Sequence, residues 1–154
     1  MATTRNFTDG SLPDHKKQHA TTPRGFNLFT LRNIVDTTKS TCDFDAAADI
    51  AQALAIPAGV IVLAVSVRVI TADANGAVLS CGVTGVDADK WGSAIAVTPA
   101  GEQEVTGGPV WNPLYFATAD TIDLLSDGGG VIDDGVFEVK AICVKGGDTI
   151  DAGE

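Results

Sequence analysis

Residues 60–70 alternate so regularly that they constrain the fold more than any other stretch of the chain. The run divides into two sets: Ile61, Leu63, Val65, Val67 and Val69 on one side, and Val60, Val62, Ala64, Ser66, Arg68 and Ile70 on the other. Period-two alternation of β-branched residues predicts a long β-strand, because successive side chains point to opposite faces of a sheet. We expect the first set to lie in the core, with Leu63, Val65 and Val67 most deeply buried.

The second set is too apolar for a surface that faces open water on a monomer. We expect a contact between subunits there, formed by Val60, Val62, Ile70 and, from a later run, Ile142. The residues therefore predict a homo-oligomer, without indicating the number of copies.

Further alternating runs follow, with turn residues between them. Asn75 and Gly76 tolerate positive φ, as a tight hairpin turn requires. The next run resumes the inward face of a partner strand with Ala77, Leu79, Cys81 and Val83. Later runs occupy residues 93–98, 113–118, 120–125 and 136–144. Strands of this length and spacing predict an all-β, antiparallel sandwich or barrel of about eight strands.

The chain divides into an arm, a β-domain and a tail. Residues 1–24 are polar, contain two prolines and lack a sustained period, which indicates an extended segment. We place the N-terminal arm at 1–25, the β-sandwich domain at 26–146 and the C-terminal tail at 147–154. The opening MATTRNFTDG lacks the apolar core of a signal peptide, and no apolar run reaches the roughly 18–20 residues of a membrane span. We therefore expect synthesis in the cytoplasm and no membrane contact.

Charge is distributed unevenly along the chain, whose net charge is −10. Residues 1–40 contain six basic and three acidic residues, a balance of +3. Residues 41–154 contain four basic and seventeen acidic residues, a balance of −13. An acidic body repels nucleic acid, so we expect no nucleic-acid partner for the domain. The basic segment is a candidate arm toward an acidic partner.

Catalytic residue combinations are scarce. The two histidines, His15 and His19, precede the domain, which leaves Ser–His and Cys–His arrangements without a histidine there. Their i, i+4 spacing fits two ligands on a helical turn, but a zinc site needs three or four. Paired carboxylates such as Asp87 with Asp89 leave a glycosidase as an alternative, although few aromatic residues are available to line a cleft. We expect no enzyme, no catalytic residues and no cofactor.

The cysteines also bear on the compartment. Cys42, Cys81 and Cys143 are an odd set without CxxC spacing. Cys81 and Cys143 fall within strand patterns, where a reduced cysteine packs as a small core residue. Free thiols are in keeping with cytoplasmic synthesis.

One tract of the domain fits either a metal loop or a plain connection. The stretch SDGGGVIDDG, residues 126–135, offers the carboxylates of Asp127, Asp133 and Asp134, which are hard oxygen ligands of the kind that calcium prefers. Their order does not match the D-x-[DN]-x-[DN]-G pattern of a calcium loop, and strand connections use Asp and Gly as well. We predict a plain connection without a bound metal, with calcium binding as the alternative.

Three stretches carry a resemblance to a known family: IPAGVIVLAVSVRVITA, GAVLSCGVTGVDADKWGS and YFATADTIDLLSDGGGVIDDGVFEVKAICV. Between about Asp49 and Val144 the chain resembles the small capsid decoration, or cement, proteins of tailed bacteriophages. In that family an IPAG-type turn opens a long strand, and a GxxxDxDxWG-like strand and loop follow. An ADDTIDL-type strand then precedes a valine-rich strand that ends in VKAxxV.

The resemblance implies a jelly-roll-like β-sandwich that assembles as a homotrimer on the outer surface of a virion and stabilises its shell. The implied partners are the major capsid protein and other copies of the chain. The arm lies outside the matching stretch, and we infer that it binds the capsid through Arg5, Phe7, Lys16, Lys17, Arg24 and Phe26. The alternative function is a jelly-roll module that binds sugar or calcium on a virion head or tail fibre. Exposed Trp91 and Trp111, coplanar with a cleft, would favour sugar binding.

Overall fold

The computed structural model describes residues 28–39, 44, 48–98, 103–104, 110–128 and 130–145. The expected arm and tail lie outside these ranges, as do His15, His19 and Cys42. Within the described ranges the regular elements are β-strands, and none of these residues form a helix long and apolar enough to cross a membrane.

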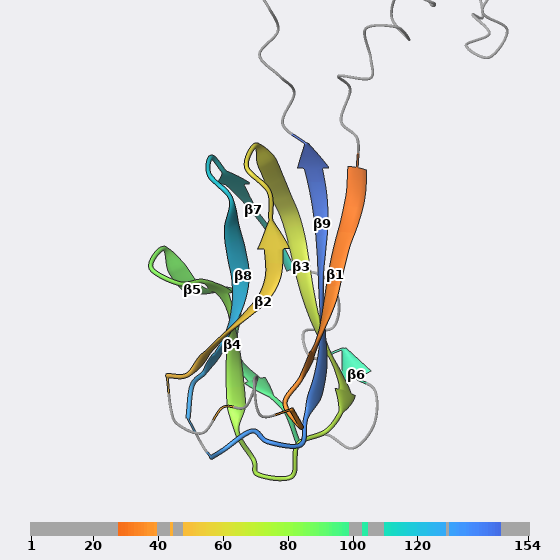
Figure 1. The fold of residues 1–154 in the computed structure, drawn as a ribbon, viewed down its shortest axis with the longest axis vertical. Helices are drawn as coiled ribbons and strands as arrows, with labels where there is room; N and C mark the ends of the chain where they lie inside the picture. The colour runs from red at the N-terminus through yellow and green to blue at the C-terminus, as the bar shows by residue number, and fades with distance from the viewer. Residues whose placement is uncertain are drawn as a thin grey trace, which may run out of the picture.

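Nine strands form in the described part of the chain, and they make two sheets (Figure 1). The first sheet contains β1 (Leu28–Asp36), β9 (Val136–Lys145) and β3 (Val60–Thr71), followed by β7 (Val110–Phe116) and the two-residue β6 (Gln103–Glu104), which both pair with β3. The second sheet contains β2 (Ile50–Ile56), β8 (Asp120–Ser126), β4 (Val78–Val83) and β5 (Asp87–Ala96).

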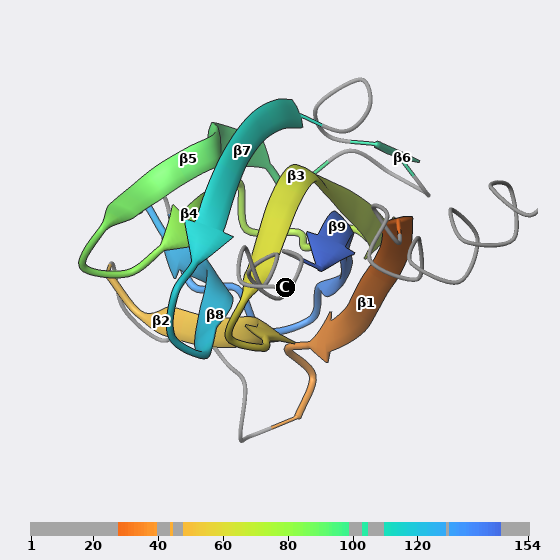
Figure 2. The same ribbon diagram turned by 90° about the horizontal axis from the view of Figure 1, so that it is seen from above.

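The strand order is that of a jelly roll. Strands pair as they would in one long antiparallel hairpin: β1 with β9, β2 with β8, β3 with β7, and β4 with β5. These pairs fall alternately in the two sheets, so the hairpin is rolled into a sandwich, as the view from above shows (Figure 2). Such packing buries the inward side chains of both sheets. The predicted antiparallel, jelly-roll-like sandwich is confirmed.

A single hydrophobic core lies between the sheets. Its largest fully buried side chains include Trp91, Phe44 and Phe137. The inward face predicted for residues 77–83 is confirmed, because Ala77, Leu79, Cys81 and Val83 are each no more than 1% exposed. Alternation at period two was a sufficient guide there, since one face of β4 packs on the core throughout its length.

Cys81 and Cys143 are free, buried thiols on β4 and β9. Burial, together with the nearby charge of Asp123, raises the pKa of Cys81 to about 12. Burial also raises the pKa of Cys143 to about 11. Both groups therefore remain protonated near neutral pH and serve as small core residues, as the sequence predicts.

Strand β3 departs from the predicted pattern at a β-bulge. Its pairing with both β9 and β7 shifts register between Val62 and Ala64. An extra residue in one strand reverses the phase of every side chain that follows it. Val60 and Val62 are therefore buried in the core, where an outward position was expected, and Leu63 is only half-buried. The prediction of core burial was right for Val65, Val67 and Val69 and wrong for Ile61 and Leu63.

The turn at Asn75 and Gly76 is not the predicted hairpin. Gly76 has a φ of 72°, which fits the predicted preference for a left-handed backbone. However, β3 already pairs with β9 on one side and with β7 and β6 on the other, so no edge of β3 is left for β4. The turn instead carries the chain from the first sheet to the second.

Candidate interaction surface

Side-chain hydrogen bonds close the two long sides of the sandwich, where edge strands of the two sheets meet. On one side the amide of Asn33 in β1 donates to the carbonyl of Ala53 in β2 at 2.8 Å. On the other side the amide of Asn112 in β7 donates to the carbonyl of Lys90 in β5 at 3.1 Å. The indole N–H of Trp91 donates to the Asn112 carbonyl at 2.9 Å. The broad surfaces that remain for a partner are the outer faces of the sheets.

The outer face of the first sheet is apolar at the end where β1 begins and β9 ends (Figure 1). Strand register places polar Thr30 opposite Ile142, and it places apolar side chains in two rows there: Leu28, Val144, Ile61 and Tyr115 in one, and Ile142, Ala64 and Trp111 in the next. Leu63 lies with them, because the bulge separates inward Val62 from inward Val65 by two residues. We call these eight residues the apolar half.

Several members of the apolar half stand out into solvent. Leu28 is 64% exposed, Trp111 is 63% exposed and Tyr115 is 58% exposed. Ala64 and Val144 are buried, although neither belongs to the core cluster between the sheets. Contiguous exposed apolar residues on a sheet face mark an interaction site, and Trp and Tyr are enriched in protein interfaces.

The remainder of the same face carries exposed Ile34 opposite Glu138, together with Arg32, Arg68, Glu138 and Lys140; we call these four charged residues the charged half. Glu138 pairs with both arginines: its Oε1 lies 3.4 Å from Nη1 of Arg32, and its Oε2 lies 3.8 Å from Nη1 of Arg68. Partly exposed ion pairs contribute only about 0–1 kcal/mol each to stability. Their main effect is on the surface charge, since three basic groups surround one carboxylate.

The second sheet has the opposite charge. Its four strands contain one basic residue, Lys90, whose Nζ donates to Oδ1 of Asn112 at 3.0 Å. The acidic residues in or directly beside these strands are Asp49, Asp87, Asp89, Asp120, Asp123 and Asp127. Asp123 is buried and accepts hydrogen bonds from the N–H of Thr84 and the hydroxyl of Thr121. Most of the others are exposed, so this sheet presents a negative surface.

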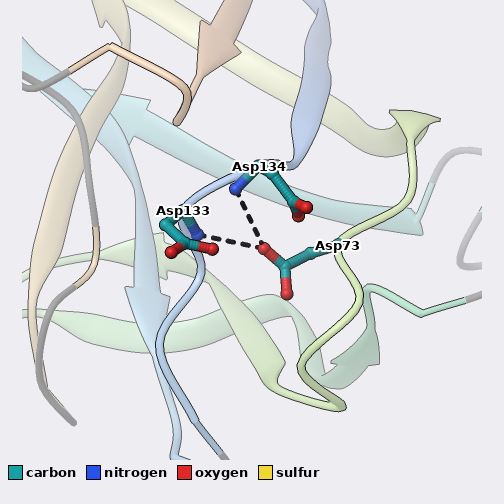
Figure 3. A group of neighbouring side chains, drawn as sticks. All are labelled: Asp73, Asp133 and Asp134. Carbon is teal, nitrogen blue, oxygen red and sulfur yellow. Dashed lines mark hydrogen bonds between the residues drawn. The ribbon is translucent and has the colours of Figure 1, made fainter.

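Three aspartates meet where the β3–β4 and β8–β9 connections lie together (Figure 3). Oδ2 of buried Asp73 accepts the backbone N–H groups of Asp133 at 3.0 Å and Asp134 at 3.2 Å. Its Oδ1 accepts the N–H of Asn75 at 2.8 Å. The Asn75 amide also donates to Oδ1 of Asp133 at 3.1 Å. Asp73 therefore ties the two connections together through backbone groups.

The electrostatics of this acidic cluster follow from those bonds. Burial disfavours the charged form of Asp73, but the N–H groups of Asn75, Asp134 and Asp133 outweigh burial and lower the pKa of Asp73. The side-chain hydrogen bond to Asp73 is the main cause that raises the pKa of Asp134. The arrangement therefore favours a proton on Asp134 and a charge on Asp73.

The predicted connection does join two strands, β8 and β9, but its three acids do not gather. Asp127 accepts a hydrogen bond from the hydroxyl of Ser80, whereas Asp133 and Asp134 lie beside Asp73. The sequence reasoning missed Asp73. A local signal existed, because Asp commonly accepts the N–H two residues further on in a turn, and Asp73 does so with Asn75.

The two tryptophans occupy different environments. Trp91 is 1% exposed in the core, whereas Trp111 belongs to the apolar half. They do not form the paired exposed platform that sugar binding would need. An open hollow of about 150 Å³ lies beside Tyr115 and is lined by Val83, Val86, Leu114, Tyr115, Phe116, Ala117, Thr118 and Asp120. This lining is mostly apolar and offers few of the polar side chains that orient a sugar.

No family model matches this chain, and no curated protein matches it. Solved structures do match. A chain in the structure titled "Cyanophage Pam1 capsid asymmetric unit" superposes with a TM-score of 0.54 at 21% identity, over 78% of this chain and 86% of that one. A chain from the acidic stable capsid structure of Helicobacter pylori bacteriophage KHP30 gives a TM-score of 0.51 at 10% identity, over 76% and 86%. At these identities the likeness is one of fold.

The residues predicted to bind the capsid lie outside the described residues: Arg5, Phe7, Lys16, Lys17, Arg24 and Phe26. Their part in binding stays a prediction. Of the surface that the structure does describe, the apolar half is the feature best suited to a partner. The predicted subunit contact included one of its members, Ile142, and assigned Val60 and Val62 to the wrong side of β3.

Proposed function

We propose that this protein is a capsid decoration protein that binds the outer surface of a phage head and stabilises the shell. The observation that carries the proposal is the jelly-roll likeness to chains in two phage capsid structures, over about three quarters of this chain. The motif resemblance between about Asp49 and Val144 supports it independently, because it rests on residue order and not on overall shape. The partners in this proposal are the major capsid protein and two further copies of the chain.

Attachment in this proposal depends on many weak contacts. Exposed ion pairs contribute only about 0.2–1 kcal/mol each, so the arm residues Arg5, Lys16, Lys17 and Arg24 do not hold one subunit by charge alone. Phe7 and Phe26 add apolar anchors that salt does not screen. Three arms on one trimer raise avidity by about 10²–10⁴ without any stronger single contact.

Co-sedimentation with phage heads tests the proposal. The purified full-length chain should pellet with intact heads that lack their own decoration protein, and it should raise the temperature at which those heads release DNA. A chain that stays in the supernatant at micromolar concentration with heads of its own phage would contradict decoration.

Arm substitutions in the full-length chain locate the contact. Lys16→Glu combined with Lys17→Glu should weaken pelleting by at least tenfold and leave the melting temperature unchanged. Lys39→Glu is the control, since it reverses an exposed basic charge of the domain, which lies 3.1 Å from Asp36. Equal binding by the arm variant and the control would move the contact to the domain.

A further inference from the structure

We infer that the apolar half of the first sheet is the surface through which a second copy of this chain binds. The inference deepens the proposed function, on which it rests for the expectation that several copies act together. The apolar half is the group of eight outward residues defined above, with Leu28, Trp111 and Tyr115 the most exposed among them.

The residue composition of the whole face resembles that of one side of a protein–protein interface. Protein interfaces have an apolar centre that is rich in Trp and Tyr, and a polar rim in which Arg is enriched. Here Trp111 and Tyr115 lie in the apolar half, and Arg32 and Arg68 lie in the charged half beside it. Three spacings of about 4.8 Å between four strands, and nine residues of β1 at about 3.4 Å each, give a face roughly 15 Å by 30 Å. That projected area, about 450 Å² for the apolar and charged halves together, is a little over half of the roughly 800 Å² per partner that a standard interface buries.

Charge selects a second copy as the occupant. The described side chains of the face include three basic groups and Glu138, whereas exposed Asp87, Asp89 and Asp120 lie at the end of the second sheet where β4 ends and β8 begins. The face of one copy is therefore complementary in charge to this end of the second sheet of another copy. A contact between two different surfaces is heterologous, and it closes into a ring when the rotation between copies divides a full turn. Face-to-face stacking of two identical basic surfaces is disfavoured by the same charges.

Sedimentation of the purified chain, without heads, is the first test. We expect association at micromolar concentration, which Leu28→Glu combined with Tyr115→Glu should abolish. Val131→Glu is the matched control, because Val131 is an exposed apolar residue, 37% exposed, in the β8–β9 connection and outside both sheets. It should leave association intact. Circular dichroism confirms that each variant is folded. Lys140→Glu should weaken association several-fold, and added salt should weaken the wild-type association.

Tryptophan fluorescence provides a second readout that needs no disruptive substitution. Trp111 is exposed and Trp91 is already buried, so association should shift the emission of the wild-type chain to shorter wavelength as concentration rises. Trp111→Phe keeps an apolar side chain on the face and should lose this shift while it still associates.

The outcomes separate this inference from the proposed function. A wild-type chain that is monomeric at micromolar concentration, or a double variant that associates as well as the wild type, overturns the inference. A monomer that still pellets with heads overturns the inference and leaves decoration standing. A chain that associates through this face but does not bind heads supports the inference and contradicts decoration.

Discussion

Asp73 shows how one buried carboxylate can organise two loops. It lies between β3 and β4, yet its oxygens accept N–H groups from Asn75 in its own turn and from Asp133 and Asp134 in the β8–β9 connection. Buried backbone N–H groups need acceptors, and strand pairing does not supply them in these turns. A charged acceptor makes the stronger hydrogen bonds, which offsets the cost of burying the carboxylate.

Replacement of Asp73 should therefore destabilise the fold. Asp73→Ala leaves the part-buried N–H groups of Asn75, Asp133 and Asp134 without their acceptor; because water can reach these exposed residues, the total cost should be about 1–3 kcal/mol. Asp73→Asn retains one oxygen acceptor and should cost less. Urea unfolding of the wild type and both variants measures their order of stability. If Asp73→Ala is as stable as the wild type, the bonds contribute nothing net and the account of this turn is wrong.

The contributions of Asp134 and Asp73 to folding stability should change with pH in opposite directions. The folded pKa of Asp134 is raised, so its contribution to stability is present below its unfolded pKa near 4 and is lost as pH rises through the folded value. Asp73, with a lowered pKa, contributes stability above pH 4 that is lost as pH falls through its folded value.

Asp134→Asn replaces the carboxyl group with a neutral amide and so separates the pH dependence caused by Asp134 from that caused by Asp73. This variant should melt at a higher temperature than the wild type at pH 7, and the difference should shrink as pH falls toward 4. Asp89→Asn, at an exposed position of β5, is the control for loss of one negative charge. A constant difference from pH 7 to pH 4 would show that general charge reduction is the cause, and not the bond to Asp73.

At the scale of an element, β3 illustrates how one inserted residue redirects a strand. The bulge between Val62 and Ala64 gives the strand two inward sets, Val60 with Val62 before it and Val65 onward after it. Without the bulge, one half of β3 or the other would turn its core residues to solvent. The same insertion directs Leu63 and Ala64 outward and so helps to form the apolar half.

Two leucine substitutions compare the stability that an inward leucine contributes with the stability that an outward leucine contributes. Leu79→Ala in β4 removes a side chain that is 0% exposed and should cost about 2–5 kcal/mol, from lost transfer energy and the cavity left behind. Leu63→Ala should cost distinctly less, because half-buried Leu63 leaves a space open to water. Chemical denaturation at concentrations low enough to prevent association makes the comparison. A cost for Leu63→Ala equal to that for Leu79→Ala would place Leu63 in the core after all.

At the scale of the whole molecule, the fold separates charges that are mixed along the chain. The strands of the first sheet hold four basic residues and three acidic ones, Asp36, Glu104 and Glu138, whereas the strands of the second sheet hold Lys90 and four aspartates. The sheets alternate along the chain, so this separation is invisible to a count of charge in sequence order. The inferred contact between copies uses this charge difference between the sheets, whereas the split at residue 40 motivates the predicted role of the arm.

Calcium should have little effect on the stability of the molecule. The oxygens of Asp73 already accept backbone N–H groups, and Asp127 lies with Ser80 outside the cluster of Asp73, Asp133 and Asp134. A ligand at 100 times its dissociation constant would stabilise the fold by about 2.7 kcal/mol. Melting temperatures with EDTA and with added calcium should therefore agree. A shift of several degrees in the wild type that disappears in Asp133→Asn would identify a calcium site.

Much of the fold could be predicted from the residues alone, because strand formation leaves a local record. Period two in residues 60–70 and 77–83 marks strands, the turn residues separate them, and buried Cys81 and Cys143 follow from the same pattern. The jelly-roll likeness came from the order of motifs. The acidic connection between β8 and β9 was also recognisable, although the partner of its aspartates was not.

The tertiary structure alone decided which face of each half of β3 is buried, where β4 pairs and what surrounds Asp133 and Asp134. These features depend on residues far apart in sequence. The bulge exists only as a mismatch between β3 and its neighbours β9 and β7, and Asp73 meets Asp133 across 60 residues. A periodic pattern reports that a strand has two faces. Which face is inward depends on the strands that pair with it, and that pairing is set by packing of the whole domain.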